Sequence, residues 1–319
     1  MQAVVVREFG GPEQLRMIEA PDPVPGPGQV RIRVMAAGVN PVDAGNRADG
    51  SWAGLRVPYV PGYDVAGVVD SLGPGVPGEA PGGVRPGDRV IAMTHFPDGA
   101  GGYAELAVAD AGLVAPIGPG TSFTQAAAAP LAAGTADLVL ARLGLAPGST
   151  LLVLGGSGGV GLFLLQMAAR RGIAAIGVGR QVMHEQMRAL GAAGCVDYTA
   201  GDVAGEAVEL AGGPVDAIAD LVGGPHLAAE LAALRPGGQI ASIATPELDL
   251  DPLLDANLTF HGVLLGDDGA RTRRLAADLA DGSLRAVVSH ELPLPKAEHA
   301  HRILERGHSG GKIVLTVRG

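Results

Sequence analysis

The glycines at positions 156, 158 and 161 have a spacing that suits the binding of phosphate groups. They follow the apolar run 151–154 and precede a helix-forming stretch, so the pattern GxGxxG lies between a strand and a helix. In such a turn one glycine allows the tight bend, another lets the backbone approach a pyrophosphate, and a third lets helix and strand pack closely. The N–H groups and positive dipole at the helix start attract phosphates. We therefore expect a dinucleotide site, the alternative being a glycine-rich turn without a ligand.

The end of the next expected strand indicates which dinucleotide binds. An NAD site usually has Asp or Glu about 20 residues after the glycines, where the carboxylate binds the ribose 2′-hydroxyl. Here the strand ends in Gly179 and Arg180, with no acid. A guanidinium is a planar, permanently charged fork that matches a phosphate. Arg180 therefore favours NADPH over NADH, the alternative being a solvated arginine and an unselective site.

The glycine turn lies within a regular alternation of strands and helices. From about residue 121 to 265, apolar strands alternate with Ala/Leu-rich helices, which predicts a doubly wound parallel sheet of the Rossmann type. We assign 121–265 to an NADPH-binding Rossmann domain. The expected strands are 151–154, 174–178, 195–197, 215–220, 239–244 and 259–264, and the expected helices are 160–171, 182–190, 202–211, 225–234 and 247–256.

The rest of the chain is richer in short β-like runs. Between residues 1 and 120 such runs are separated by Pro and Gly, which predicts a barrel-like, β-rich substrate domain. The tail 266–319 should add one helix and two strands and complete this domain. The expected strands are 1–6, 30–36, 65–70, 89–93, 104–107, 286–292 and 312–317, and a surface loop is expected at 73–87.

Composition excludes several classes of protein. The 319 residues suffice for two domains, and the net charge of -10 argues against a nucleic-acid or anionic-membrane surface. No apolar run reaches the roughly 18 residues of a membrane span. The first residues predict a strand rather than a signal peptide. The single cysteine, Cys195, excludes an intrachain disulfide and a multi-cysteine zinc site, so we expect a cytoplasmic protein.

Several short motifs occur in an order that resembles one family. The chain resembles the medium-chain dehydrogenase/reductase superfamily, and within it the zinc-free quinone oxidoreductase (ζ-crystallin-like) branch. The resemblance extends over almost the whole chain. Besides the glycine turn, its markers are AGVNPVD at 37–43, PGYDVAG at 61–67, GDRV at 87–90, GYAE at 102–105, GTA at 134–136, Gln166 and GKIVL at 311–315.

The resemblance implies a GroES-like substrate domain, a Rossmann cofactor domain, an active-site cleft between them, and a homodimer. It implies that Asn40 and Thr135 lie near the nicotinamide and that Arg180 and Tyr198 lie by the adenosine 2′-phosphate. It places Lys312 in the closing motif, near the cofactor. It also implies that the pyrophosphate is held by Ser157, Gly158, Gly159 and Val160.

Departures from zinc-dependent relatives point to metal-free chemistry. Those relatives have a cysteine near the position of Asn40, a His-Glu pair where this chain has Tyr63-Asp64, and a four-cysteine lobe. Without the zinc Lewis acid, alcohol oxidation is impractical, and hydride transfer to an acceptor that is already electrophilic remains. The dimer is expected to pair the edge strand 259–265 with its symmetry mate.

The sequence leaves the residues around the acceptor open. Quinone reductases of this branch often have tyrosine where this chain has Gly45, which would widen the pocket. Tyr63 is the preferred candidate proton donor, with a packing role as the alternative, and Tyr59 and His95 are weaker candidates. Trp52 and Phe96 either line the pocket or anchor a local core. Asp43 and Asp64 are expected to be structural, Cys195 to be an inert buried thiol, and the remaining histidines to lie mostly at the surface.

Three functions fit these residues. The first is an NADPH-dependent reductase of quinones or α,β-unsaturated carbonyls, with Asn40 and Tyr63 in the active site. The second is a non-catalytic NADPH-binding protein with a structural or regulatory role. The third, a narrower form of the first, is a pathway-specific enoyl reductase of secondary metabolism. The acceptor is set by the pocket and not by the fold.

Overall fold

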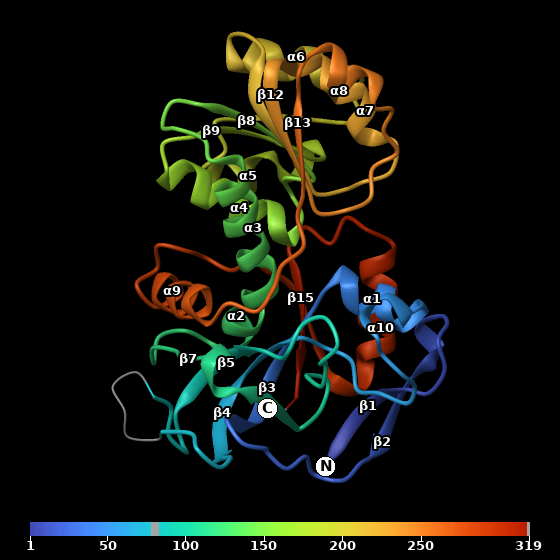
Figure 1. The fold of residues 1–319 in the computed structure, drawn as a ribbon, viewed down its shortest axis with the longest axis vertical. Helices are drawn as coiled ribbons and strands as arrows, with labels where there is room; N and C mark the ends of the chain where they lie inside the picture. The colour runs from blue at the N-terminus through green and yellow to red at the C-terminus, as the bar shows by residue number, and fades with distance from the viewer. Residues whose placement is uncertain (78–82, 318–319) are drawn as a thin grey trace. The chain divides into compact units, whose positions relative to one another are not determined.

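A computed structural model describes residues 1–77 and 83–317 of the chain. The chain divides into two units, residues 1–134 with 266–319 (the first unit) and residues 135–265 (the second unit) (Figure 1). The change of unit lies at 134 and not near 120, because α2 (Phe123–Ala127) packs on strands of the first unit. Residues 78–82 of the expected loop lie outside the described residues.

The first unit is built on a mainly antiparallel sheet. Its strand order is β14-β15-β3-β4-β5-β7, with β6 also paired to β3, and β1 and β2 form a separate hairpin. The tail contributes β14 and β15, and β15 pairs antiparallel with β3. The strands are β1 (Gln2–Val6), β2 (Leu15–Glu19), β3 (Gln29–Val39), β4 (Asp64–Leu72), β5 (Arg89–Met93), β6 (Leu106–Asp110), β7 (Val114–Pro116), β14 (Val288–Pro293) and β15 (Lys312–Thr316).

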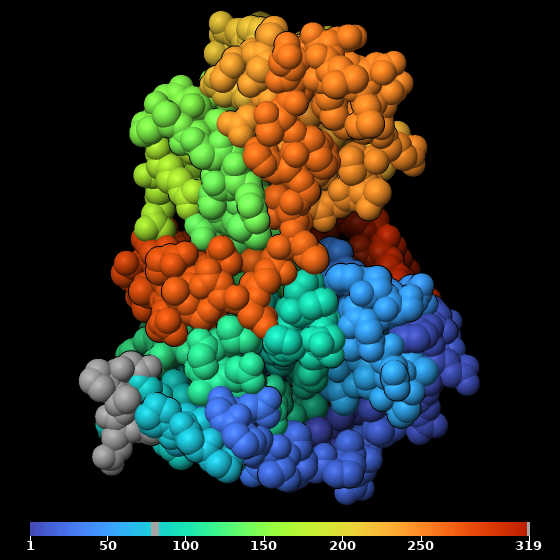
Figure 2. Space-filling model, in the orientation of Figure 1, coloured from blue at the N-terminus to red at the C-terminus, as the bar shows by residue number. Residues whose placement is uncertain are grey.

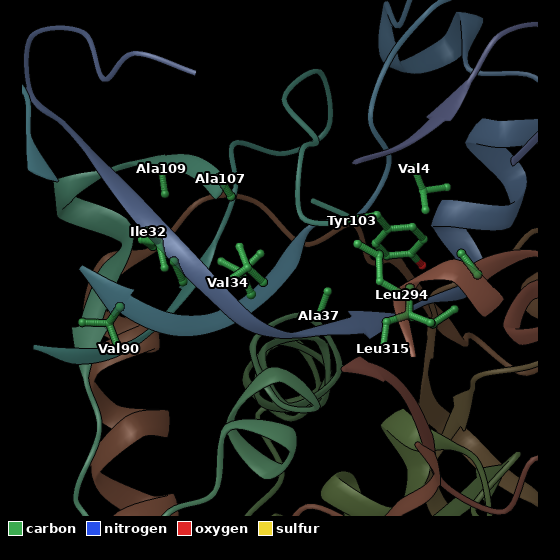
Figure 3. Close-up of a cluster of buried hydrophobic side chains, with 14 of the residues drawn as sticks. Val4, Ile32, Val34, Ala37, Val90, Tyr103, Ala107, Ala109, Leu294 and Leu315 are labelled. Carbon is green, nitrogen blue, oxygen red and sulfur yellow. The ribbon is translucent and has the colours of Figure 1, made fainter. Parts of the chain in front are cut away.

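Aliphatic side chains from this sheet form the core of the first unit. Along β3, Val30, Ile32 and Val34 are completely buried and alternate with partly exposed residues, as period-two alternation requires of a strand with one covered face; Figure 3 shows Ile32 and Val34 in this cluster. Leu294 and Leu315 from the tail join the same cluster. The tail is therefore part of this core, and the first unit cannot be completed without it.

Helices cover parts of this unit. The tail has two helices where the sequence predicted one: α9 packs on β5 and β7, and α10 packs on α1 and β15 (Figure 1). Residues of α9, in orange-red, form part of the surface in Figure 2. The second was missed because α10 is a short helix of nine residues close to two prolines. The elements are α1 (Pro41–Ala48), α9 (Gly269–Ala280), α10 (Ala297–Glu305) and the 3₁₀ turns η1 (Pro12–Gln14), η2 (Ser51–Ala53), η3 (Ala111–Leu113) and η6 (Leu294–Lys296).

The second unit has the predicted Rossmann sheet. Its six described strands are all parallel in the order β10-β9-β8-β11-β12-β13, the 3-2-1-4-5-6 order of a doubly wound fold. The order reverses between β8 and β11, where such folds bind ligands. The strands are β8 (Thr150–Leu154), β9 (Ala174–Val178), β10 (Gly194–Val196), β11 (Val215–Asp220), β12 (Leu234–Ser242) and β13 (Thr259–Gly262).

The helices of the second unit follow the predicted alternation with shifted limits. One long helix, α3 (Pro130–Leu143), was not predicted; it begins in the first unit and continues in the second. Two expected helices, 225–234 and 247–256, are reduced to five-residue helices. The elements are α4 (Gly159–Arg170), α5 (His184–Ala189), α6 (Val203–Ala211), α7 (His226–Glu230), α8 (Asp251–Asp255), η4 (Gln181–Met183) and η5 (Leu231–Ala233). No described helix is long and apolar enough to span a bilayer.

Candidate dinucleotide site and active site

The glycine turn links β8 to α4. Its left-handed residue is Gly155, with φ of 79°, so the bend is made one residue before Gly156, to which the spacing assigned it. A Cβ on Gly156 would lie 2.9 Å from the Gly177 Cα of β9, and one on Gly161 would lie 2.6 Å from the Gly156 carbonyl oxygen. Both glycines are needed because backbone approaches backbone at these points.

Gly158 has a different environment. It is the N-cap of α4, and no side chain caps this helix end. A Cβ on Gly158 would have one described atom within 4 Å, the Gly155 carbonyl oxygen at 3.3 Å. Ser157, Gly159 and Val160 beside it are half-buried. The turn thus combines an uncapped helix start with a residue that has no side chain, which is the arrangement that a pyrophosphate requires.

Arg180 lies two residues after the end of β9, the strand that pairs with β8. Its side chain is exposed, and its Nε donates to the hydroxyl oxygen of Tyr198 at 3.0 Å. Tyr198 is itself 41% exposed. The two residues that the resemblance places by the 2′-phosphate are therefore in contact, and the bond holds the guanidinium by Nε while its terminal nitrogens can still face a ligand.

A buried carboxylate, which the sequence analysis did not single out, holds the loop that follows β11. Asp220 ends β11 and is fully buried. Its carboxylate accepts from the Ser242 hydroxyl at 2.7 Å and from the backbone N–H groups of Val222 and Gly223 at 3.1 and 2.9 Å. These bonds fix the loop after β11, beside the strand that carries the glycine turn.

In the first unit, Asn40 is held by a buried lysine. The pairing of Ile313 with Val39 brings Lys312 to the end of β3. Its Nζ donates to the Val39 carbonyl oxygen at 3.0 Å and to the Asn40 Oδ1. Asn40 Nδ2 in turn donates to Asp64 Oδ2 at 2.9 Å, and Lys312 Nζ lies 3.9 Å from the same oxygen. The amide of Asn40 is therefore fixed in one orientation.

Two buried carboxylates share this lysine. Asp43 accepts from the Asn40 N–H at 2.8 Å and from the Tyr103 hydroxyl at 3.2 Å. Burial raises the pKa of Asp43 to about 7, and the neighbouring carboxylate of Asp64 adds to this. Burial likewise raises the pKa of Asp64 and lowers that of Lys312, each against the attraction of the opposite charge. Two carboxylates and one ammonium would together carry a net charge of about −1, so the raised pKa of Asp43 favours the protonated form of this carboxyl up to about pH 7.

Two hydrogen bonds and a ring contact hold the side chain of Tyr63 in place. Its hydroxyl accepts from Asn46 Nδ2 and donates to the Pro97 carbonyl oxygen, both at 2.6 Å. Its ring packs edge-on against Phe96, with centroids 4.9 Å apart. Burial raises the pKa of Tyr63 above its usual value. A role as proton donor would require the bond to Pro97 to break.

Comparison with known proteins identifies the family. The profile Alcohol dehydrogenase GroES-like domain matches residues 26–119, and the profile Zinc-binding dehydrogenase matches residues 190–315. Quinone oxidoreductase of Mus musculus is 30% identical over 99% of this chain and 97% of its own length. The chain belongs to the medium-chain dehydrogenase/reductase superfamily, in its quinone oxidoreductase branch. It is an oxidoreductase of a nicotinamide-nucleotide-dependent family.

Other relatives and solved structures agree on the family and differ in coenzyme. An NADPH-dependent alkenal/one oxidoreductase of Arabidopsis thaliana is 32% identical over 99% of this chain and 79% of its own length. A structure titled NAD-dependent alcohol dehydrogenase has a TM-score of 0.91, 32% identity and full coverage of both chains. A mycobacterial structure complexed with NADPH has a TM-score of 0.88 and 32% identity, covering 99% of this chain and 100% of that one.

The predicted site residues of this oxidoreductase divide between its two units. The glycine turn, Arg180 and Tyr198 belong to the second unit, and so does Thr135, which is buried on α3. Asn40, Tyr63 and Lys312 belong to the first unit. No group of three or more His, Cys, Asp or Glu side chains in the described residues could hold a metal ion.

The sequence missed part of the polar network in the first unit. His301, one of the histidines expected mostly at the surface, is completely buried, and its Nε2 lies 3.2 Å from the Tyr103 hydroxyl. The signal that could have found it is its place between apolar residues on the inner face of α10.

Cys195 is buried, as predicted, and burial raises the pKa of its thiol. A Cβ added at Gly45 would meet no described atom within 4 Å. The position therefore has room for a side chain.

Asp43 and His301 are expected to give opposite pH dependences of stability. The pKa of Asp43 is raised to about 7, so between about pH 4 and 7 the folded protein keeps a proton that the unfolded chain has lost, and stability falls as pH rises. Burial lowers the pKa of His301 to about 3, so below about pH 6.5 only the unfolded chain takes up the proton, and stability falls as pH falls.

Variants separate the two groups. In Asp43→Asn the loss of stability toward low pH should be steeper than in the wild type, and in His301→Gln stability should fall with rising pH. Each slope is at most about 1.4 kcal/mol per pH unit. Urea unfolding at intervals between about pH 4 and 7 measures these slopes. Parallel curves for both variants and the wild type would show that neither group changes its protonation on folding.

Proposed function

We propose that the protein reduces quinones or α,β-unsaturated carbonyl compounds with NADPH and without a metal ion. The observation that carries the proposal is the edge of the Rossmann sheet, where an uncapped helix start follows the glycine turn, Arg180 and Tyr198 form a hydrogen-bonded pair, and no acid directly follows β9. The absence of a metal-ligating group in the described residues favours an acceptor that is electrophilic by itself.

The residues of this chain have distinct roles in the proposed reaction. When bound, the nicotinamide supplies the hydride. The turn from Ser157 to Val160 would hold the pyrophosphate, and Arg180 with Tyr198 would bind the 2′-phosphate. Asn40 would contact the nicotinamide through its remaining amide hydrogen, because Lys312 and Asp64 occupy the rest of its amide.

The single proton that completes the reduction after hydride transfer is assigned to solvent or to Tyr63. A quinone that receives a hydride becomes a stabilised anion, which takes its proton from water without help. An enone needs a proton on carbon, and Tyr63 could supply it only after its hydroxyl leaves Pro97. If Tyr63 is the donor, Tyr63→Phe should slow enones far more than quinones.

The proposal is tested by NADPH consumption with a panel of quinones and enones, in the presence and absence of a chelator. We expect turnover of at least one class, unchanged by the chelator, and no stoichiometric zinc by elemental analysis. Tight NADPH binding without turnover of any acceptor would favour the alternative of a non-catalytic binding protein. Activity lost on zinc removal would overturn the metal-free assignment.

The coenzyme preference is expected to depend on Arg180. Arg180→Ala should weaken NADPH binding roughly 10- to 100-fold, because a charge-assisted hydrogen bond is worth about 1.5–3 kcal/mol, and NADH binding should change little. Tyr198→Phe keeps the ring but removes the bond to Nε, so it should produce a smaller loss in the same direction. Titration of both dinucleotides by calorimetry measures the effect. Equal losses for NADPH and NADH would remove Arg180 from the 2′-phosphate site.

We also propose that β13 mediates a homodimer. It is the last strand in the order of its sheet, and the chain there exposes Phe260 to 38% and Leu264 to 64%. An apolar edge strand with unpaired backbone groups is closed most simply by its two-fold mate. The N–H of Val263 already donates to the Ser242 carbonyl oxygen, so Val263 is unsuitable as a site for a disruptive proline.

Leu264→Asp is expected to shift the protein from dimer to monomer, because it places a charge in each half of a two-fold apolar contact. Leu254→Asp is the matched control: Leu254 is 74% exposed, but it lies on α8 and not on the edge strand. Light scattering at micromolar concentration reports the mass. A wild type that is monomeric at every concentration, or a control that dissociates equally, would contradict this arrangement.

A further inference from the structure

Three aromatic rings form a continuous row in the first unit. Tyr63 is buried, Phe96 is 7% exposed, and Trp52 in η2 is 52% exposed. The ring centroids of Phe96 lie 4.9 Å from Tyr63 and 6.3 Å from Trp52, with interplanar angles of 67° and 60°. The row therefore leads from a buried ring to an indole that is half open to solvent. We call Trp52 and Phe96 together the aromatic ledge.

The backbone around Phe96 is held in place. The N–H of Phe96 donates to Asp267 Oδ1 at 3.2 Å, and His95 Nδ1 lies 2.5 Å from Asp267 Oδ2. The hydroxyl of Tyr63 is tied to Asn46 and to the Pro97 carbonyl oxygen. Such anchoring reduces the entropy that binding would otherwise cost, because Phe96 and Tyr63, on which the Trp52 ring is aligned, do not have to be ordered by the ligand.

We propose that the aromatic ledge binds the flat ring of the electron acceptor, and that Trp52 determines its preference for ring-shaped acceptors over open-chain ones. The proposal rests on the proposed function. An indole face is electron-rich, and a quinone ring is electron-poor, so the two faces attract each other when stacked. An open-chain enone offers no ring to stack and gains only a small apolar contact.

The binding test uses the fluorescence of Trp52, the only tryptophan of the chain. The full-length protein is titrated with 1,4-naphthoquinone, with and without saturating NADP⁺, under excitation selective for tryptophan. We expect saturable quenching, whereas free N-acetyltryptophanamide should show only linear collisional quenching. This readout does not require turnover. Quenching that matches the free indole in both titrations would overturn the proposal.

The kinetic test compares two acceptors. Trp52→Ala should raise KM for 1,4-naphthoquinone roughly 10- to 100-fold, since it removes a stacked contact and its buried area, and should raise KM for 3-buten-2-one far less. Trp52→Phe keeps a ring and should recover much of the loss. Val24→Ala, at an 83% exposed apolar position elsewhere in the first unit, is the matched control and should behave as the wild type.

The outcomes separate the two proposals. Saturable quenching without turnover of any acceptor would remove the proposed reductase function and leave the ledge as a binding site. Turnover of naphthoquinone with the same KM in Trp52→Ala would leave the function and remove the ledge. Thermal melting of each variant shows whether it is folded, and Trp52→Leu, which keeps apolar volume without a ring, replaces Trp52→Ala if that variant is not folded. An equal rise of KM for both acceptors would also contradict a role in selecting ring-shaped ones.

Discussion

Lys312→Met is expected to lower the free energy of unfolding by about 3–5 kcal/mol, the usual cost of removing one partner from a buried ion pair. Lys312 is 4% exposed, and Asp43 and Asp64 beside it are buried. Methionine has a similar length but no charge, so both carboxylates would lose their common counter-ion. The Asn40 Oδ1 and Val39 carbonyl oxygen would also lose their donor.

A double variant separates charge from packing. The double variant Lys312→Met/Asp64→Asn removes the carboxylate charge at position 64 together with the lysine charge that pairs with it. The new asparagine can still accept the hydrogen bond from the Leu131 N–H. We expect this variant to recover part of the loss, because unpaired charge and not lost volume is the larger cost. Denaturant unfolding of Lys312→Met, of Asp64→Asn alone and of the double variant measures this coupling. A loss below about 1 kcal/mol for Lys312→Met would show that the cluster is not held by charge.

Gly158→Ala is expected to weaken NADPH binding at least about 10-fold while leaving the fold intact, because an added methyl would occupy the place where backbone must approach a pyrophosphate. The backbone of Gly158, with φ of -80°, accepts alanine, and the nearest described atom to the added Cβ would be 3.3 Å away. Gly161→Ala should instead destabilise the second unit, since its Cβ would meet the backbone of Gly155 and Gly156.

The pair therefore distinguishes a ligand site from a packing site. Calorimetry gives the affinity for NADPH and thermal melting gives the stability of each variant. Gly45→Ala, a helical glycine in the first unit with no neighbour within 4 Å of its Cβ, is the control. It should leave NADPH affinity unchanged and stabilise the protein by about 0.5–1 kcal/mol. Full NADPH affinity in Gly158→Ala would show that the turn does not approach the phosphates.

Local patterns in the sequence were enough to predict the second unit. Strands 151–154, 174–178 and 215–220 were predicted within one residue of β8, β9 and β11, because each is a short apolar run between turn residues. The glycine spacing and the absence of an acid before Arg180 are likewise properties of short segments. Such features are encoded by neighbours in the chain, so no tertiary information is needed to recognise them.

Features that join distant segments were decided only by the tertiary structure. The sequence grouped Asn40 and Lys312 by resemblance, but it could not show that the lysine binds the amide of Asn40, because that contact depends on the pairing of β15 with β3 across 272 positions. His301 was one of several histidines expected mostly at the surface, and the packing of α10 in the first unit, where His301 meets the Tyr103 hydroxyl, buries it completely.

The sequence by itself determined the fold class, the place of the glycine turn between β8 and α4 and the family, since these depend on residue type and short-range spacing. The tertiary structure alone decided which polar groups are buried and paired: Asp43 and Asp64 with Lys312, Tyr63 with Asn46, and Trp52 with Phe96. The physical reason is that the cost of burying a charge and the contact between two rings depend on three-dimensional neighbours, which the chain brings together only when it folds.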